Sequence, residues 1–138
     1  MTSSRIVLSH GCFDPLHIGH LKHFKAAKAM GDMLVVAITR DKFVNKGARR
    51  PVFSEQLRKE MIEELRCVDL TVLVESTLHA LESVKPHIFV KGGDYVTRIE
   101  PQHRQYCEAH GIEIRFTNEV HYSSTDLLHY YDRPIIPQ

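Results

Sequence analysis

Short apolar segments alternate along this chain with segments whose apolar residues recur at helical spacing, and this alternation constrains the fold more than any other feature. Residues 33–39 form a continuous apolar run, as is typical of a strand covered on both faces. Strands that alternate with helices favour an α/β fold with a doubly wound parallel sheet. The expected strands are residues 5–9, 33–39, 70–74, 87–90 and 112–116, and the expected helices are residues 18–30, 54–66, 77–84 and 101–110.

Three residues mark expected helix ends. Ser54 is placed to accept a backbone N–H as an N-cap. Gly31 and Gly111 follow helical segments, where glycine commonly provides the C-terminal cap.

Length and charge bound the organisation and the partners of the chain. A length of 138 residues lies near the common size of one domain, so we expect residues 1–138 to form a single domain with an irregular tail at about 132–138. With 18 Lys and Arg against 17 Asp and Glu, the formal net charge is +1, which gives no bulk attraction for nucleic acid or an anionic membrane. No apolar run approaches the roughly 20 residues of a membrane-spanning helix. We therefore expect no nucleic-acid partner and no membrane association.

The three cysteines, Cys12, Cys67 and Cys107, are odd in number and widely spaced. The first residues lead into a strand rather than into the apolar core of a secretory signal. Both features indicate a reducing, cytoplasmic compartment. Cys12 has no activating base beside it in the sequence, so a packing role is favoured over a nucleophilic one.

Two histidines lie three residues apart where the first expected strand runs into the first expected helix. Gly11 follows the strand and permits a tight turn, and His17 and His20 then fall in the first helical turn. A helix N-terminus offers backbone N–H groups and a positive dipole end to a phosphate group. Because residues at i and i+3 share a helix face, both imidazoles can reach the same oxygens, and Gly19 lets a ligand approach the backbone. The pattern predicts catalysis on a nucleoside triphosphate.

His23 continues the same spacing, and it leaves two other interpretations open. Three histidines on one face could be a solvated surface or an opportunistic zinc site. No CxxC pair, HExxH motif or compact carboxylate partner accompanies them, which argues against zinc. We expect no protein-bound metal site.

The segment from Gly11 to His20 resembles the GxFDxxHxGH signature of the nucleotidyltransferase superfamily, and residues 17–20 spell the HIGH motif. Within that superfamily the chain is similar to the small cytidylyltransferase-like branch, which includes glycerol-3-phosphate cytidylyltransferase and the heptose 1-phosphate adenylyltransferase domain. The resemblance implies a Rossmann-like nucleotidyltransferase fold. It also implies that the signature residues bind nucleotide: Gly11, Cys12, Phe13, Asp14 and Gly19. Asp14 could orient the loop between the first expected strand and the first expected helix, called here the signature loop, or it could orient the water shell of a metal. The sequence leaves both roles open.

Residues 40–51, called here the basic loop, follow the second expected strand and hold five basic residues. Taken alone, such a loop is as readily an ordinary solvated one. The resemblance implies a lysine that reaches the triphosphate, for which Lys46 is the best match and Lys42 the second, the latter assigned to substrate binding.

The expected helix at 54–66 also resembles the family through its Arg58-Lys59 pair, which makes Arg58 a candidate phosphate or substrate ligand. From the residues alone, Arg58 could instead pair with Glu55 on an exposed face, as Lys59 could with Glu63.

Two later strings complete the expected nucleotide site. Residues 91–95 read KGGDY and resemble the heptose 1-phosphate adenylyltransferase branch more than the glycerol-3-phosphate branch, although paired glycines alone indicate only a turn. Residues 122–125 would open a C-terminal helix and resemble the family string that holds the β- and γ-phosphates, although capping alone would also explain them. The expected nucleotide-binding residues here are Lys91, Gly92, Gly93, Asp94, Tyr122, Ser123, Ser124 and Thr125.

The resemblance implies an enzyme that couples an NTP to a phosphorylated small molecule and releases pyrophosphate, with Mg²⁺ as cofactor. The favoured pair is ATP with a sugar 1-phosphate such as heptose 1-phosphate. CTP with glycerol 3-phosphate or another polyol phosphate is the alternative, and a non-catalytic nucleotide-binding module is an alternative of another class. Relatives are commonly dimers, so a homodimer is expected. His17, His20 and Lys46 are the expected catalytic residues.

Overall fold

The computed structural model describes residues 4–92, 99–118 and 128. Its centre is a five-stranded sheet in the order β3-β2-β1-β4-β5, and every strand pairing in it is parallel. The strands are β1 Ile6–Gly11, β2 Met33–Thr39, β3 Leu70–Val74, β4 Ile88–Gly92 and β5 Glu113–Thr117. The helices are α1 Ile18–Lys28, α2 Glu55–Glu63, α3 Thr77–Val84 and α4 Pro101–Ala109, with a short 3₁₀ turn, η1, at Asp41–Phe43.

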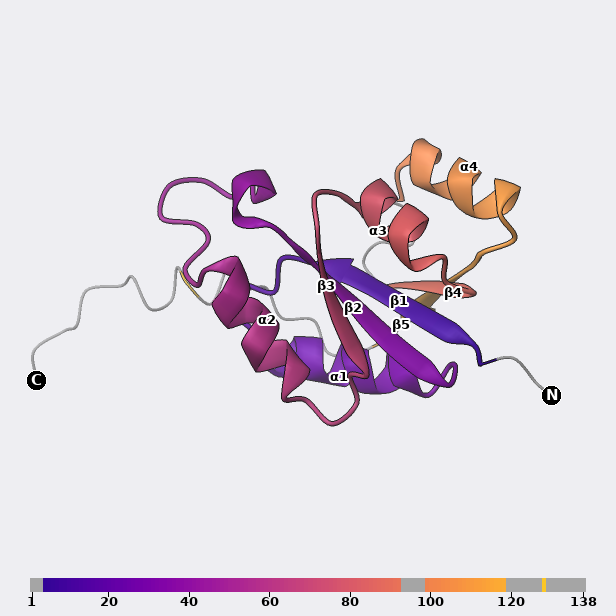
Figure 1. Ribbon diagram of the computed structural model, residues 1–138, viewed down its shortest axis with the longest axis horizontal. Coiled ribbons are helices and arrows are strands. Elements are labelled where there is room, and N and C mark those ends of the chain that lie inside the picture. Colours follow the sequence, from indigo (N-terminus) through magenta and orange to yellow (C-terminus); the bar gives the residue numbers. More distant parts are fainter. Residues whose placement is uncertain (1–3, 93–98, 119–127, 129–138) are drawn as a thin grey trace, which may run out of the picture.

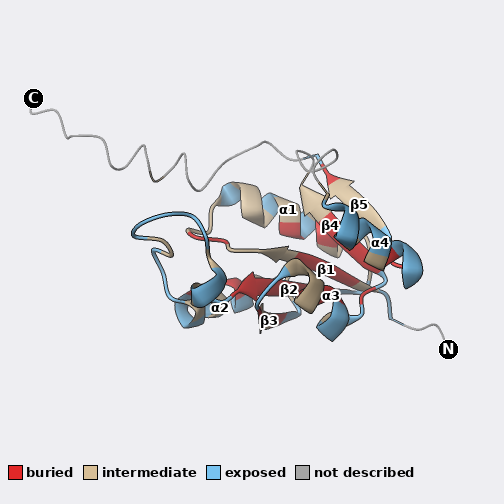
Figure 2. Cartoon of the chain, turned by 90° about the horizontal axis from the view of Figure 1, so that it is seen from above, coloured by how far each residue is buried: buried red, intermediate tan, exposed pale blue. Residues whose placement is uncertain are grey.

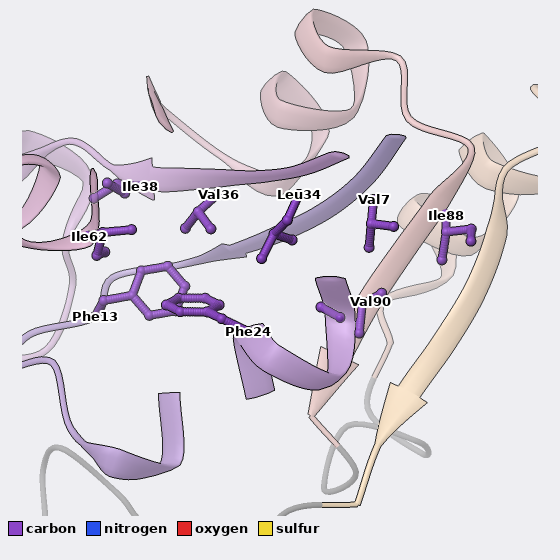
Figure 3. Close-up of a cluster of buried hydrophobic side chains, with 10 residues drawn as sticks. Val7, Phe13, Phe24, Leu34, Val36, Ile38, Ile62, Ile88 and Val90 are labelled. Atoms are coloured by element: carbon purple, nitrogen blue, oxygen red, sulfur yellow. The ribbon is translucent and has the colours of Figure 1, made fainter. Parts of the chain in front are cut away.

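Helices cover both faces of the sheet, as Figure 1 shows, with α1 and α2 on one side and α3 and α4 on the other. Two apolar clusters lie between these layers. The first packs α1 and α2 side chains, such as Phe24 and Ile62, against inward residues of β1, β2 and β4 (Figure 3). The second packs Leu81 of α3 and Cys107 of α4 against the opposite face of the sheet. The expected doubly wound parallel α/β sheet is confirmed.

The three inner strands β1, β2 and β4 hold most of the buried strand residues, because both of their faces are covered, whereas the edge strand β5 is mostly half-buried and the helices expose their outer sides (Figure 2). In β2 every residue after Met33 is buried, which accounts for its uninterrupted apolar sequence. The chain order changes direction between β1 and β4, the neighbouring central strands. In sheets of this kind ligands bind outside the carboxyl ends of the strands at that switch point. The fold therefore places a site where Gly11 and Gly92 end their strands.

The helix ends differ from expectation at one glycine and agree at two other positions. Ser54 caps α2 by accepting the N–H of Leu57, and Gly111 follows α4 with a left-handed φ of 67°, both as predicted. Helix α1 ends earlier than expected, at Lys28. Its C-cap is Ala29 and not Gly31. A Cβ at Gly31 would lie 2.7 Å from Val7 Cγ2 and 2.9 Å from the backbone oxygen of Arg5. Close approach to β1, rather than a helix cap, is the reason for glycine there.

The three cysteines carry free thiols. Burial raises the pKa of the Cys67 and Cys107 thiols, which favours the neutral form of each. Within residues 4–92 and 99–118, none of the helices combines the length and apolar character that crossing a bilayer requires.

Candidate active site

Helix α1 begins with a reciprocal pair of hydrogen bonds around the two signature histidines. His17 is the N-cap residue, and its Nδ1 accepts the N–H of Gly19 at 3.1 Å. The N–H of His17 donates in turn to Nδ1 of His20, also at 3.1 Å. Because both Nδ1 atoms accept, each neutral ring carries its proton on Nε2. The capping geometry therefore fixes one tautomer and makes Nε2–H the donor of each imidazole.

The two imidazoles lie face to face at the amino end of α1. Their ring centroids are 3.7 Å apart, and the ring planes differ by 22°. Stacking holds the rings parallel, so their two Nε2–H groups form a paired set of donors beside the positive end of the helix dipole. The two imidazoles thus lie together as expected, although His17 is the N-cap residue with an extended backbone and not part of the first helical turn.

His20 is uncharged at neutral pH. Its pKa is lowered from the ordinary value to about 3, first by burial and then by neighbouring positive charges, among them His17 and Lys46. The imidazole is therefore a neutral hydrogen-bond donor in the ligand-free protein. An anionic triphosphate nearby would oppose these positive charges and raise the pKa of His20.

Phe13 packs against His20, one of the two signature histidines. Its ring meets His20 edge-on at a centroid distance of 5.1 Å and Phe24 at 5.0 Å, inside the α1–α2 core (Figure 3). The backbone of Phe13 has a positive φ of 53°. A Cβ at Gly11 would lie 2.9 Å from this ring, so residue 11 is glycine to make room for Phe13 and not to permit a tight turn. The nucleotide contacts expected of these two residues stay predictions.

Asp14 orients loops. Its carboxylate is buried and accepts the N–H of Val52 at 2.7 Å, that of Phe53 at 2.9 Å and Nε of Arg50 at 3.2 Å. Nη2 of Arg50 also donates to the Asp14 carbonyl at 2.7 Å. Both carboxylate oxygens bind protein donors, which fits orientation of the signature loop, one of the two roles that the sequence left open. The other role stays a prediction.

Arg58 is also enclosed. Its side chain is 0% exposed, and its guanidinium donates to the carbonyls of Phe53 and Cys12 and to Oδ1 of Asp41. The pairing with Glu55 that the sequence left open is not formed by these nitrogens, since Glu55 accepts from Arg40 and from the N–H of Asp41. Direct substrate contact by Arg58 stays a prediction.

The other pairing suggested for α2 is present. Lys59 forms an ion pair with Glu63 one turn further along the helix. Both side chains are partly exposed, so the pair contributes little to stability.

Lys42 and Lys46 are both exposed on the basic loop, with Lys42 in η1. Lys46 lies close enough to the histidine pair for its charge to lower the pKa of His20. The structure thus brings Lys46 toward the signature histidines, and Figure 1 shows the basic loop extending beyond the carboxyl ends of the strands.

Lys91 and Gly92 end β4, the neighbour of β1 at the switch point, and Lys91 Nζ lies 5.3 Å from the Phe89 ring centroid. These positions agree with the expected edge of the sheet. The remaining expected nucleotide-binding residues lie outside the described residues: Gly93, Asp94, Tyr122, Ser123, Ser124 and Thr125.

His10 is a site-proximal residue that sequence reasoning did not single out. Its Nε2 lies 3.0 Å from Oγ1 of Thr39, which donates to the Gly11 carbonyl, and its Nδ1 lies 2.9 Å from Oγ1 of Thr77. Burial first, then the charge of Lys91, lowers the pKa of His10 to about 3. His10 is therefore a neutral link between β1, β2 and α3. In the sequence, the one indication of this linking role is that His10 directly follows an expected strand.

His23 is half-buried, and both of its ring nitrogens lie within hydrogen-bond distance of other side chains. Nε2 lies 2.8 Å from Oγ of Ser9, and Nδ1 lies 2.8 Å from Oγ1 of Thr117, so the ring links α1 to β1 and β5. The surface interpretation of the three histidines is wrong for this one. Across the part of the chain that the structure describes, no group of three His, Cys, Asp or Glu side chains is arranged to hold a metal ion.

A parallel α/β sheet with paired histidines at a helix N-terminus beside its switch point defines the nucleotidyltransferase-like class of α/β proteins. The model of the Cytidylyltransferase-like family matches residues 8–129. The chain belongs to this family.

Relatives agree with this placement. The Bifunctional protein HldE of Pelobacter propionicus is 38% identical over 125 residues, covering 88% of this chain and 25% of that protein. The Bifunctional protein HldE of Helicobacter pylori strain P12 is 39% identical over 102 residues, covering 71% of this chain and 22% of that protein. The chain thus spans a quarter or less of the length of these relatives.

Solved structures show the same fold. The lipopolysaccharide core biosynthesis protein from Thermoplasma volcanium GSS1 superposes with a TM-score of 0.73 at 29% identity, covering 86% of this chain and 100% of that chain. A putative nicotinate-nucleotide adenylyltransferase from Vibrio parahaemolyticus superposes with a TM-score of 0.67 at 14% identity, covering 92% and 86%, a likeness in fold alone.

Proposed function

We propose that this chain transfers a nucleotidyl group from an NTP, with ATP favoured, to a sugar 1-phosphate such as heptose 1-phosphate, and releases pyrophosphate. The observation that carries the proposal is the capping geometry of α1, which makes Nε2–H the donor of both His17 and His20 at a helix N-terminus. Paired Nε2–H donors there suit the oxygens around a phosphorus atom on which charge develops.

The acceptor phosphate oxygen would attack the α-phosphorus in line. A new P–O bond forms while the bond to the β-phosphate bridging oxygen breaks, and pyrophosphate leaves with that electron pair. His17 and His20 would donate to oxygens of the transferring phosphoryl group, and Lys46 would neutralise the departing pyrophosphate. Catalysis is then positioning and charge stabilisation, with no covalent enzyme intermediate. The string Ser123–Thr125 is proposed to hold the same leaving group.

Mg²⁺ is proposed to enter with the NTP. Asp14, the buried carboxylate of the signature loop, already accepts protein donors on both oxygens and does not suit a metal. Mg²⁺ keeps several waters and binds mainly through substrate phosphates, where it would supply further charge neutralisation. The described residues are thus compatible with a metal that the substrate carries.

The choice of acceptor rests on sequence likeness. The KGGDY string resembles the heptose 1-phosphate adenylyltransferase branch. The neighbour from Thermoplasma volcanium, at 29% identity, is named for lipopolysaccharide core biosynthesis, a carbohydrate setting. Both favour a sugar phosphate over glycerol 3-phosphate.

The test is pyrophosphate release with Mg²⁺ for ATP, CTP, GTP and UTP, each combined with heptose 1-phosphate, other sugar 1-phosphates and glycerol 3-phosphate. The proposal expects the highest kcat/KM for ATP with a sugar 1-phosphate. Preference for CTP with glycerol 3-phosphate would replace the substrate assignment. Silence with every pair, in a folded protein that still binds nucleotide, would favour the non-catalytic binding module.

A further inference from the structure

Arg58 is the largest fully buried side chain among the described residues, and it is a charged one. Its three nitrogens each serve a different segment. Nε donates to the carbonyl of Phe53 at 3.0 Å, Nη1 to that of Cys12 at 2.9 Å, and Nη2 to Oδ1 of Asp41 at 2.7 Å. One guanidinium thus joins the signature loop, the start of the basic loop and the segment that leads into α2.

Stability alone is a poor reason for an arginine at this place. Burying a guanidinium carries a desolvation cost, and its one carboxylate partner among these acceptors, Asp41, is 40% exposed. Apolar side chains of similar volume often replace buried ion pairs without loss of stability. An apolar side chain cannot replace the planar guanidinium group, whose N–H donors hold three acceptors in one geometry.

The basic loop is held at both of its ends. At its start, Asp41 is bound by Arg58 and also donates its N–H to Glu55 at 2.9 Å. Beyond its end, the N–H of Phe53 donates to Asp14, whereas the carbonyl of Phe53 accepts from Arg58. Arg58 thus contacts both ends, together with Glu55 at the start and Asp14 at the end, and of these residues it is the one that binds both.

The span between these ends has little support of its own. Residues 45–49 are all exposed, and a Cβ added at Gly47 would meet nothing within 4 Å. Lys46 lies in this span, and its charge nevertheless reaches His20. The distance between Lys46 and the histidine pair is thus set mainly by the anchored ends.

We propose that Arg58 is a positioning residue that sets the spacing between the histidine pair and Lys46, and through it the hold on the triphosphate. This inference rests on the proposed function, because it gives Lys46 the role of a phosphate contact. It assigns Arg58 no contact with substrate.

A double-mutant cycle tests the inference. Turnover is measured for the wild type, Arg58→Met, Lys46→Ala and the double variant, with Arg104→Met, an exposed arginine on α4, as the matched control. A misplaced contact can cost about 10²-fold, so Arg58→Met should lower kcat/KM about 10- to 100-fold. In the Lys46→Ala background the same substitution should cost less than about threefold, because the contact that Arg58 positions is already gone. Arg58→Lys keeps the positive charge but lacks the planar guanidinium, so its kcat/KM should stay as low as that of Arg58→Met.

Equal losses in the two backgrounds would overturn the inference, since a direct substrate contact or a general loss of folding acts independently of Lys46. If Arg58→Met does not fold, Asp41→Asn takes its place in the cycle, because it weakens the charge-assisted bond from the exposed side.

A second readout separates this inference from the proposed function. The dissociation constant of inorganic tripolyphosphate is measured by calorimetry for the same proteins. Coupling between Arg58 and Lys46 in that binding, with no turnover for any substrate pair, would refute the proposed function and support the positioning role. Turnover without coupling between Arg58 and Lys46 would support the proposed function and refute the positioning role. A wild type that neither turns over nor binds tripolyphosphate would refute both.

Discussion

The signature loop and the basic loop lie at the same edge of the sheet but are built in opposite ways. The signature loop is fixed by buried contacts, with Phe13 in the core and Asp14 bonded on both carboxylate oxygens, and its histidine donor His20 is neutral. The span around Lys46 is exposed and charged. Burial gives a donor a precise position but disfavours its charge, whereas exposure preserves charge but not position. A polyphosphate site gains by combining the two.

The largest expected effect is on the buried side of this comparison. His20→Ala removes a fixed donor and should lower turnover by about 10²- to 10³-fold without unfolding the protein. Pyrophosphate release measures the loss, and thermal unfolding checks the fold. His110→Ala, at an exposed position after α4, is the control. Wild-type turnover in His20→Ala would refute the assignment of this histidine.

On the exposed side the expected effect is smaller. Lys46→Ala should cost about 10- to 100-fold, because a solvated charge contributes less than a donor fixed in a protected site. The loss should shrink as salt is added, since salt screens exposed charges. Kinetics at low and high ionic strength measure both quantities, with Lys25→Ala on α1 as the control. A larger loss in Lys42→Ala would move the phosphate contact to Lys42.

A third experiment addresses the close packing of Gly11 against the ring of Phe13, which contacts His20. Gly11→Ala places a Cβ 2.9 Å from the Phe13 ring and should lower the free energy of unfolding by about 1–3 kcal/mol. Urea unfolding measures the change. Adding Phe13→Leu should recover part of the loss by shortening the side chain, and absence of any recovery would place the strain elsewhere.

The last expected effect, and the smallest for any single side chain, is a pH dependence of stability. The pKa values of His10 and His20 are each lowered to about 3, so between about pH 6.5 and 3 the unfolded chain binds more protons than the folded one. Stability should be fully present above pH 6.5 and fall with decreasing pH, by on the order of 1–2 kcal/mol per histidine at pH 5. Urea unfolding at pH 7 and pH 5 measures it. The pH 7 to pH 5 difference should become smaller in His10→Gln, and an unchanged difference would contradict the assignment.

The architecture could be predicted because it depends on patterns that are local in sequence. Uninterrupted apolar runs such as residues 34–38 reflect strands covered on both faces, and the N-cap at Ser54 has a short-range signature. The pairing of the signature histidines could be predicted equally well, since their geometry depends on a three-residue spacing at one helix start.

The supporting contacts could not be predicted in the same way. A buried carboxylate such as Asp14 needs donors, but nothing in the sequence says that they come from residues 50, 52 and 53. Arg58 offered an i−3 neighbour in Glu55, yet the fold brought Asp41 within 2.7 Å instead. For Gly11 and Gly31, packing decides, and packing is visible only in three dimensions. The acceptor and the oligomeric state depend on surfaces that short-range patterns do not encode.

The main chain of Phe53 lies between the two buried charges of the site, with its N–H bound to Asp14 and its carbonyl bound to Arg58, while the residue as a whole is 37% exposed. Position 53 is therefore constrained as a piece of backbone and not as an amino-acid type. A library of substitutions there should tolerate most side chains and reject proline, which has no N–H to donate. Variation of the side chain at this position among homologues would therefore not mean that the residue is unimportant.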